Sequence, residues 1–523
     1  MSSLIVTAAQ MGQIEERVFA NGMPVAALME KAAGRLADWI QGHYPQPRRV
    51  GVLVGPGHNG GDALVVAREL HFQGYEVRVY APFEHLKDLT ATHARYVKGL
   101  GVSWNTQLEP LHDCDLFVDG LFGYGLERPI PEPVLGAIAV LNSWLPPVIS
   151  IDLPSGIHTD TGAVLGIAVR ATHTLCLGLW KLGLFQEQAL DYGGDGVLIE
   201  LDIPKADIDA VLGHPPLLTG ITREDAIAAL PYHRPPVTHK YQQGRLLLIA
   251  GSRSYGGAAI LAGLGARASG VGMLSLAVPS SLQSLVLSQL PEAVVIGCHE
   301  STTGAIAPVC IDQLSSRSYD AIACGPGLTT AAVEVVQWAV QQNCPLVLDA
   351  DGLNSLSELD PIQSLSRRSA PTLLTPHSGE FKRLFPKIEL ADRVNAASRA
   401  AAQTNAIVIL KGPRTLIARP DGRIAINPRS TPALARGGSG DVLTGILGGL
   451  VAGASTPHLP NTLEQLASGA VWWHAQAALL AAQECSMMGV DPLTLSRYLL
   501  PSLVSAYQNP YSDRLGSSFP ERT

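Results

Sequence analysis

One carboxylate, Asp441, ends a glycine-rich run in the segment ALARGGSGDVLTG (433–445). Glycines allow backbone N–H groups to approach a phosphate closely. Apolar residues with a helical repeat follow at once, so we expect Asp441 in the first turn of a helix, where the helix dipole favours its ionised form. An ionised carboxylate beside a phosphate-binding loop is a base for a hydroxyl group that attacks phosphorus. The alternative is an aspartate that only caps its helix; the glycines and the upstream segment KGPRT (411–415) favour the catalytic interpretation.

A second glycine-rich segment, GPGHNGG (55–61), contains a literal G-x-G-x-x-G pattern between an expected strand and an expected helix. This pattern is typical of dinucleotide-binding loops, although short glycine patterns are common. The next expected strand ends in VYAP (79–82) and has no carboxylate at its tip. Nicotinamide-dependent dehydrogenases place an acidic residue there to bind the ribose, so the sequence argues against a dehydrogenase.

Polar residues also follow the other expected strands in the first part of the chain. Asn59, Asp119 and Ser155 supply an amide, a carboxylate and a hydroxyl, whose oxygens suit an alkali or alkaline-earth cation. Asp152 and Lys181 could transfer protons. The carboxyl ends of parallel strands meet at one crevice, so we expect these side chains to lie together. Taken singly, such residues are also ordinary turn formers and helix caps.

The elements that must position these residues are apolar β-branched runs that alternate with helical patterns in two blocks. This alternation predicts an α/β fold with two three-layer domains, each a mostly parallel sheet between helices. We place the domains at residues 1–213 and 214–523, because residues 205–240 are rich in proline and show no strand signal. Residues 406–428 are expected to form a strand, a loop and a hairpin with Asp-Gly at its turn, and residues 463–483 the last long helix.

The composition excludes several classes of protein. Of 523 residues, 46% are hydrophobic and 16% charged, and the net charge is −8, so we expect a large core and no surface for nucleic acid or an anionic membrane. The seven cysteines form no CxxC pair, which is typical of reduced thiols and not of a disulfide framework or a zinc site. No signal peptide or membrane-spanning run is apparent, so we expect a cytoplasmic protein without membrane contact.

Four segments of the first block are similar in order and spacing to the NAD(P)H-hydrate epimerase domain, which has a Rossmann-like fold; they are HNGGDALVVAR (58–68), VDGLFGYGLERP (118–129), SIDLPSGIHTDTG (150–162) and GLWKLGLF (178–185). The resemblance implies that Asn59, Asp119 and Ser155 bind K⁺, and that Asp152 and Lys181 do acid–base work. It also implies a group of contacts with the hydrated nucleotide, namely His58, Asn59, Gly60, Gly61, Asp62, Gly123, Tyr124, Gly125, Leu126, Glu127, Arg128, Pro129 and Asp152. At His58 and Ala63 the family more often has asparagine and glycine.

Segments of the second block resemble the ADP- or ATP-dependent NAD(P)H-hydrate dehydratase of the ribokinase-like superfamily; they are GPGL (325–328), LDADGLN (348–354), TPHSGEF (375–381), KGPRT (411–415) and GGSGDVLTG (437–445). The resemblance implies that Gly327, His377 and Asp441 bind the hydrate, and that Asp441 takes the proton of its 6-hydroxyl group. It implies adenine-nucleotide contacts from Lys411, Gly412, Pro413, Arg414, Thr415 and Gly440. The chain departs from the family pattern at Thr329, Gly352, Arg436 and Ser439, and Arg436 could add a phosphate contact.

Together the two resemblances imply a bifunctional repair enzyme. One half would interconvert the R and S forms of hydrated NADH and NADPH (NADHX and NADPHX), in the presence of K⁺. The other would dehydrate the S form to NAD(P)H at the expense of ADP, with ATP as the other possible nucleotide and with Mg²⁺, giving AMP and phosphate. We expect these small molecules as partners, no nucleic acid, and a homo-oligomer. The alternatives are a ribokinase-like small-molecule kinase with a regulatory first domain and, for the first block alone, a non-catalytic ion-dependent nucleotide- or protein-binding module.

Overall fold

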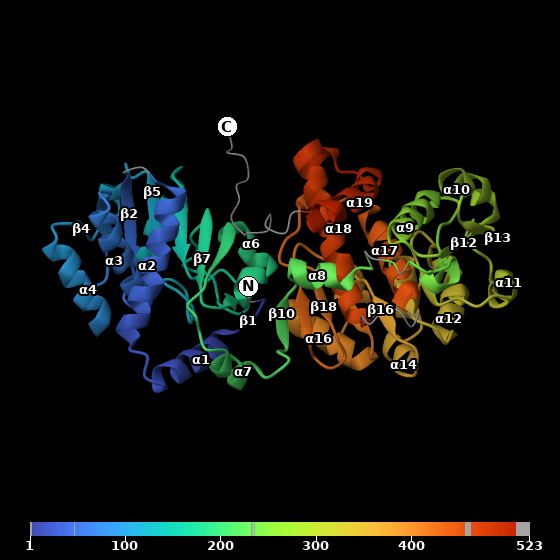
Figure 1. Cartoon of the computed structure of the whole chain (residues 1–523), viewed down its shortest axis with the longest axis horizontal. Helices are drawn as coiled ribbons and strands as arrows, with labels where there is room; N and C mark the ends of the chain where they lie inside the picture. Colours follow the sequence, from blue (N-terminus) through green and yellow to red (C-terminus); the bar gives the residue numbers. More distant parts are fainter. Residues whose placement is uncertain (1–2, 46–47, 232–233, 235, 455–461, 509–523) are drawn as a thin grey trace. The chain divides into compact units, whose positions relative to one another are not determined.

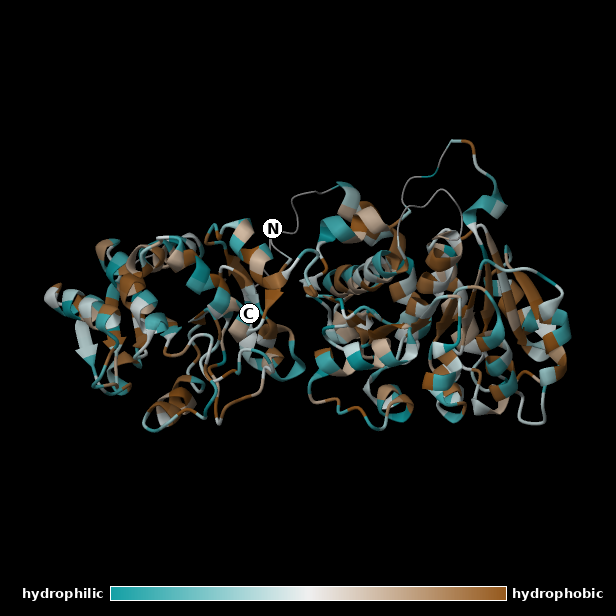
Figure 2. Cartoon of the chain, turned by 90° about the horizontal axis from the view of Figure 1, so that it is seen from below, coloured by the Kyte–Doolittle hydropathy of each residue, from teal (hydrophilic) through white to brown (hydrophobic). Residues whose placement is uncertain are grey.

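The computed structural model describes residues 3–45, 48–231, 234, 236–454 and 462–508. The chain divides into two compact units, of which the first ends at Leu218 and the second begins at Thr219 (Figure 1). Both are α/β structures, as predicted, and their strands are mostly hydrophobic (Figure 2). Among the described residues, no helix is both long enough and apolar enough to cross a bilayer.

The first unit is built on a seven-stranded parallel sheet in the order β4-β3-β2-β5-β6-β7-β9. Its strands are β2 (Arg49–Val54), β3 (Glu76–Tyr80), β4 (Ser103–Asn105), β5 (Leu116–Gly120), β6 (Val148–Ile151), β7 (His173–Leu177) and β9 (Asp195–Ile199). A separate parallel pair joins β1 (Ile5–Val6) to β8 (Trp180–Lys181). The chain moves outward from β2 in one direction and continues from β5 in the other, so the strand order reverses between these two strands. A ligand crevice is expected beyond their carboxyl ends.

The helices of the first unit are α1 (Ala8–Ala20), α2 (Val25–His43), α3 (His58–Phe72), α4 (Asp88–Gly99), α5 (Val134–Leu141), α6 (Leu190–Gly193) and α7 (Lys205–Leu212). Thr7 caps α1 in a capping box with Gln10, which fixes where that helix begins. Helices α2 and α3 pack side by side against the sheet (Figure 1). The crevice is therefore bounded by the first turn of α3 and by the loops that follow β5 and β6.

The G-x-G-x-x-G segment serves close backbone packing. A Cβ atom on Gly55 would lie 1.6 Å from the carbonyl oxygen of Leu121, and one on Gly60 would lie 1.9 Å from that of Gly55. At Gly57 no neighbouring atom lies within 4 Å of such a Cβ. Gly55 thus lets the loop between β2 and α3 pack against the loop after β5, and Gly60 lets the start of α3 pack against Gly55.

We expect Gly60→Ala to destabilise the first unit by about 3 kcal/mol, because the new methyl group meets backbone that cannot move aside. Gly57→Ala is the matched control and should change stability by no more than about 1 kcal/mol, the range of a helix-cap substitution. Urea unfolding of the two variants measures both values. Equal effects would show that backbone packing is not what requires glycine at position 60.

The second unit contains a ten-stranded sheet in the order β10-β19-β18-β17-β16-β15-β14-β11-β12-β13. Its strands are β10 (Leu218–Gly220), β11 (Arg245–Ile249), β12 (Met273–Pro279), β13 (Val294–Cys298), β14 (Ala321–Cys324), β15 (Leu346–Leu348), β16 (Thr372–Leu374), β17 (Ile407–Leu410), β18 (Leu416–Ala418) and β19 (Ile424–Ile426). The seven strands from β11 to β17 pair in parallel. The predicted antiparallel hairpin is confirmed, with Asp421 and Gly422 at its turn. The expectation of no strand within residues 205–240 was wrong, since β10 lies there. It is a short strand at the edge of the sheet, where neighbouring prolines are tolerated.

The helices of the second unit are α8 (Arg223–Ala229), α9 (Gly256–Ala268), α10 (Gln283–Gln289), α11 (Ile311–Ser315), α12 (Val333–Gln341), α13 (Asp351–Glu358), α14 (Pro361–Ser366), α15 (Ser378–Leu384), α16 (Arg393–Thr404), α17 (Ser439–Ala454), α18 (Leu463–Cys485) and α19 (Pro492–Gln508). The prediction that residues 463–483 form the last long helix was wrong, because α19 follows with 17 residues. Its internal Pro501 weakens the helical signal in the sequence.

Helix α17, which begins just before Asp441, is buried almost all round and not on one face only. It packs backbone to backbone against α9. A Cβ atom on Gly445 would lie 1.8 Å from the carbonyl oxygen of Ala262, and one on Gly265 would lie 2.1 Å from that of Val442. Close-packed interiors leave little room for displacement, so the first turn of α17 has a fixed position in the second unit.

Candidate active sites

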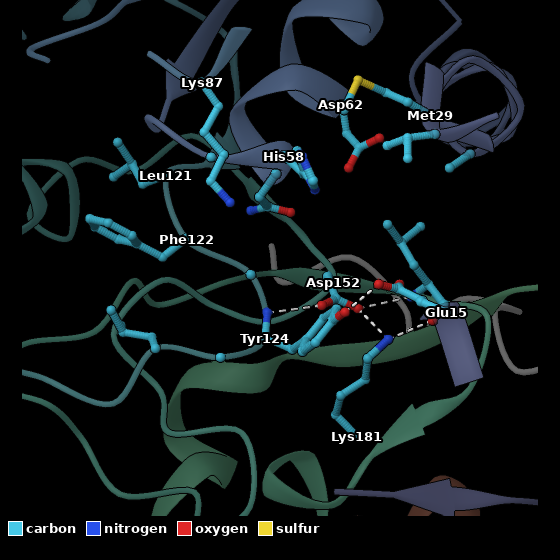
Figure 3. A pocket seen from close by; sticks show the side chains of 18 of the residues that line it. Glu15, Met29, His58, Asp62, Lys87, Leu121, Phe122, Tyr124, Asp152 and Lys181 are labelled. Carbon is cyan, nitrogen blue, oxygen red and sulfur yellow. Dashed lines mark hydrogen bonds and ion pairs between the residues drawn. The ribbon is translucent and has the colours of Figure 1, made fainter. Parts of the chain in front are cut away.

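A cavity of about 880 Å³ opens in the first unit beyond the carboxyl ends of β2 and β5 (Figure 3). The predicted contacts that line it are His58, Asn59, Asp62, Gly123, Tyr124, Gly125, Leu126, Glu127, Arg128, Asp152 and Lys181. Its wall also contains Glu15, Met29 and Lys87, which the sequence analysis did not mark. Gly60, Gly61 and Pro129 lie outside this wall. A Cβ on Gly61 would lie 2.6 Å from Met29 Cε, so that glycine serves packing between α2 and α3.

Asp152 and Lys181 form a buried ion pair at the cavity, with Nζ 2.6 Å from Oδ1 and side-chain exposures of 4% and 1%. Asp152 also accepts hydrogen bonds from the backbone N–H groups of Tyr124 (3.1 Å) and Leu177 (3.2 Å). Burial opposes the charged form of Lys181, but the combined attraction of Asp152, Cys176 and Glu15 and the hydrogen bond to Asp152 outweigh it and raise the pKa of the ammonium group. The backbone of Asp152 is left-handed, with φ 68°, a strained conformation that clusters at functional sites.

Two further carboxyl groups face the same cavity. Burial raises the pKa of Asp62 well above its ordinary value, and repulsion from Asp152 and Glu15 adds to this effect. Burial also raises the pKa of Glu15, whose carboxylate accepts a hydrogen bond from the hydroxyl of Tyr124. The cavity therefore combines one anchored ion pair with two groups that hold a proton at higher pH than usual.

The three predicted K⁺ ligands lie beside the cavity. Fully buried Asp119 accepts hydrogen bonds from the hydroxyls of Ser155 (2.6 Å) and Ser150 (2.8 Å). Burial raises the pKa of Asp119 against the effect of these bonds. The side chain of Asn59 reaches toward Gly123, and its buried Nδ2 has no hydrogen-bond partner in the structure as described.

This donor set fits an alkali cation. Turning the Asn59 amide by 180° would exchange its unpaired N–H₂ for an oxygen, and a cation would offset the desolvated charge of Asp119. Within the described residues, no three His, Cys, Asp or Glu side chains are grouped as a metal site. An amide, a hydroxyl and one carboxylate favour a hard cation of low charge.

The second unit contains a comparable buried cluster at the carboxyl ends of β15 and β17. Lys411 Nζ lies 2.6 Å from Asp349 Oδ1, and the hydroxyl of Thr444 on α17 donates to Asp349 Oδ2 at 2.6 Å. Burial disfavours the charge of Lys411, yet the attraction of Asp349 and Glu380 raises the pKa of the ammonium group. A Cβ on Gly440 would lie 3.2 Å from Lys411 Nζ, so this glycine admits the lysine beside the first turn of α17.

Asp441 lies in that first turn, as predicted. The prediction that the helix dipole favours its ionised form was wrong, because its surroundings raise its pKa. Burial raises the pKa of Asp441 to about 7, and repulsion from Asp349 contributes, whereas Lys411 acts in the opposite direction. The helix dipole contributes too little to overcome these effects. A carboxyl group that titrates near neutrality is well matched to accept a proton during catalysis.

Other predicted residues of the second unit occupy loops around this cluster. His377 is the N-cap of α15 and its backbone N–H donates to Glu380 (2.8 Å), while Gly327 has φ 66° and closely approaches Tyr255. Residues 412–415 join β17 to β18. Burial and the nearby charge of Arg429 lower the pKa of Arg414 to about 10, and its buried Nε has no hydrogen-bond partner among the residues described. Nη1 donates to the carbonyl of Pro413 at 3.4 Å, and the unpaired Nε suits an anionic ligand.

Sequence reasoning missed Asp349, Glu380 and Thr444 as members of the site. Asp349 and Glu380 stand inside the segments LDADGLN and TPHSGEF, so their position at strand ends was a usable signal. Thr444 lies one helical turn after Gly440 and carried no separate signal. Arg436, for which the sequence suggested a phosphate contact, donates from Nη2 to the carbonyl of Met488 at 2.7 Å.

Both α/β units place a buried lysine–aspartate pair beside a carboxyl group whose pKa is raised, an arrangement typical of an enzyme with two active sites. Residues 246–501 match the family described as NAD(P)H-hydrate dehydratase, and residues 25–183 match the YjeF-related protein N-terminus. The chain belongs to the family of bifunctional NAD(P)H-hydrate repair enzymes.

Two relatives illustrate this membership. The bifunctional NAD(P)H-hydrate repair enzyme Nnr of Thermosynechococcus vestitus is 52% identical over 95% of this chain and 97% of its own. That of Synechocystis is 50% identical over 95% and 94%, respectively. Among solved structures, the ADP/ATP-dependent NAD(P)H-hydrate dehydratase of Bacillus subtilis, co-crystallised with ATP/Mg²⁺, is 32% identical and covers 55% of this chain and 98% of its own, with a TM-score of 0.47.

Proposed function

We propose that the first unit interconverts the R and S forms of NADHX and NADPHX in its 880 Å³ cavity. The buried Asp152–Lys181 pair carries this assignment, because inversion at C6 of the hydrated ring needs proton donors and acceptors and no redox partner. Asp119, Ser155 and Asn59 would hold K⁺, which supplies a fixed positive charge beside the substrate loops. The loop residues His58 and Asp62 and residues 123–128 contact the nucleotide in this proposal.

We propose that the second unit dehydrates the S form with ADP or ATP, and the position of Asp441 carries this assignment. Asp441 takes the proton of the 6-hydroxyl group, whose oxygen bonds to the terminal phosphorus as the bond to the AMP or ADP leaving group breaks. The phosphate ester then leaves C6 with the bonding electrons, and loss of a C5 proton restores the dihydropyridine. Lys411 and the N–H groups at the start of α17 stabilise the phosphate charge, and residues 412–415 contact the nucleotide. Mg²⁺ bound with the nucleotide would add positive charge to the phosphates.

The decisive experiment incubates the protein with chemically prepared NADH hydrate and ADP or ATP while the absorbance of the reduced ring is followed. The proposal expects the absorbance to rise with release of free phosphate, and expects both epimers to be consumed. A phosphorylated alcohol that accumulates without reduced nicotinamide would support the small-molecule kinase instead. Rapid consumption of the S epimer, followed by loss of the R epimer only at the spontaneous rate of R-to-S conversion, would exclude epimerase activity from the first unit.

The rate of dehydration should depend on pH through Asp441. A base must be ionised to accept a proton, and the pKa of Asp441 is about 7. We therefore expect kcat to rise about tenfold per pH unit below that pKa and to level off above it. Turnover measured with saturating nucleotide and S hydrate checks this; a rate that stays constant well below the pKa would exclude Asp441 as the base.

A further inference from the structure

Glu15 reaches the Asp152–Lys181 pair from an element that lies outside all the glycine-rich loops. It stands on α1, which the capping box at Thr7 holds in place. Its carboxylate accepts the hydroxyl hydrogen bond of Tyr124, and the charges of both Lys181 and Asp152 act on it (Figure 3). The cavity therefore has a third wall, made by α1, that presents a single carboxyl group to the substrate space.

Glu15 also contributes to the walls of two cavities. The first is the 880 Å³ cavity already described, and the second has a volume of about 510 Å³ and lies between α1 and the segment before α7. Glu15, Leu28 and Leu201 line both. The remaining wall of the second cavity is largely apolar, with Met11, Ile14 and Val18 from α1. A carboxyl group that lines both cavities can meet a ligand in one and exchange its proton in the other.

We propose that Glu15 is a catalytic acid of the epimerase site, paired with Asp152 as the base; this inference rests on the proposed function of the first unit. Neutral Glu15 gives its proton to the 6-hydroxyl oxygen, and the C6–O bond breaks so that its electron pair leaves with water. The lone pair of the ring nitrogen forms an N1=C6 bond. A water molecule then adds to the opposite face of C6, the N1=C6 electron pair returns to nitrogen, and Asp152 accepts the surplus proton.

The surroundings of Glu15 agree with an acid that stays protonated until it is needed. Burial raises its pKa, while the hydrogen bond from Tyr124 and the charge of Lys181 oppose this and Asp152 adds to it. The charge of Glu15 in turn raises the pKa of Asp62 on α3. Asp152 differs because it lies 2.6 Å from the ammonium group of Lys181. Two carboxyl groups with different surroundings in one site are the usual arrangement for an acid and a base. The net transfer of one proton from Glu15 to Asp152 is reset by exchange with solvent, for which the second cavity, also lined by Glu15, offers a route.

The test is Glu15→Gln in the full-length protein, with Glu16→Gln as the matched control, because Glu16 is the exposed neighbour on the same helix. Relaxation of a purified hydrate epimer is followed by chromatography without nucleotide, so that dehydration is silent. We expect Glu15→Gln to slow relaxation about 100-fold or more, the usual contribution of a general acid, and Glu16→Gln to stay within about twofold of the wild type. The wild-type rate should fall at high pH as Glu15 ionises, and this decline should be absent from Glu15→Gln.

Urea unfolding serves as the folding check for the first unit and should show it folded in both variants. Dehydration of the S hydrate with nucleotide, which the second unit performs, should also be unchanged. A Glu15→Gln protein that epimerises at the wild-type rate, or that is slowed but keeps the high-pH decline, overturns the role of Glu15 while leaving the proposed function of the first unit intact. A wild-type protein that does not accelerate relaxation at all overturns the proposed function, and this inference with it.

Discussion

Asp441→Asn is expected to lower the kcat of dehydration about 10³-fold, within the range for loss of a general base. Asparagine keeps the shape of the side chain in the first turn of α17 but cannot accept the proton of the 6-hydroxyl group. The interaction lost exists only in the transition state, so KM for the hydrate and the nucleotide should change little. Initial rates of reduced-nicotinamide formation, measured with each substrate varied in turn, give both constants.

The same Asp441→Asn protein contains its own control, since epimer interconversion depends on a different set of residues and should keep the wild-type rate. The stability of the protein toward urea should be unchanged or slightly higher, because the substitution removes the repulsion between Asp441 and the buried carboxylate of Asp349. A variant that retains more than about a tenth of the wild-type kcat would show that another group is the base, since such an effect is below that of general base catalysis.

Asp152→Asn is expected to have two large effects in the first unit. Epimer interconversion should fall at least about 100-fold, because the base is lost. The unit should also lose about 3–5 kcal/mol of stability, because Lys181, with 1% exposure, remains buried without its partner. Relaxation of a purified epimer measures the first effect, and urea unfolding of the same sample measures the second.

The double variant Asp152→Asn with Lys181→Met separates the two effects. Removing both charges eliminates the unpaired ammonium group and should recover most of the lost stability, because the large cost of losing one partner comes from the uncompensated buried charge. It should not recover epimerisation. If activity returned together with stability, Asp152 would be needed only for folding, and the ion pair would have no part in the chemistry.

The sequence predicted the elements and segments well where a local pattern was sufficient. Both sheets, the hairpin around Asp421 and the start of a helix at Asp441 follow from hydrophobic period and turn residues. The order of the segments also brought Asp152 and Lys181 to one sheet edge, where the structure pairs them. Helix α19 and strand β10 were missed because prolines obscure a short or interrupted pattern.

The electrostatics of the sites could not be predicted in this way. The pKa of Asp441 depends on Asp349, which is 92 residues earlier in the chain and meets it only through the fold. Glu15 belongs to a helix with an ordinary amphipathic pattern, and nothing near it in the sequence distinguishes it from Glu16. The charge state of a buried carboxyl group depends on its three-dimensional surroundings. The glycine loops of the site, by contrast, can be predicted from residues that are adjacent in the sequence.

The backbone contact between α9 and α17 has a consequence for how this enzyme can evolve. At Gly265 and Gly445 even one added carbon would overlap a carbonyl oxygen of the facing helix, so neither position accepts an ordinary point mutation without moving α17. Moving α17 would displace Asp441 from Lys411 and Asp349. The two helices thus keep a fixed position relative to each other. We expect sequence changes that alter substrate or nucleotide preference to fall in the surrounding loops, such as residues 412–415 and the segment after β14.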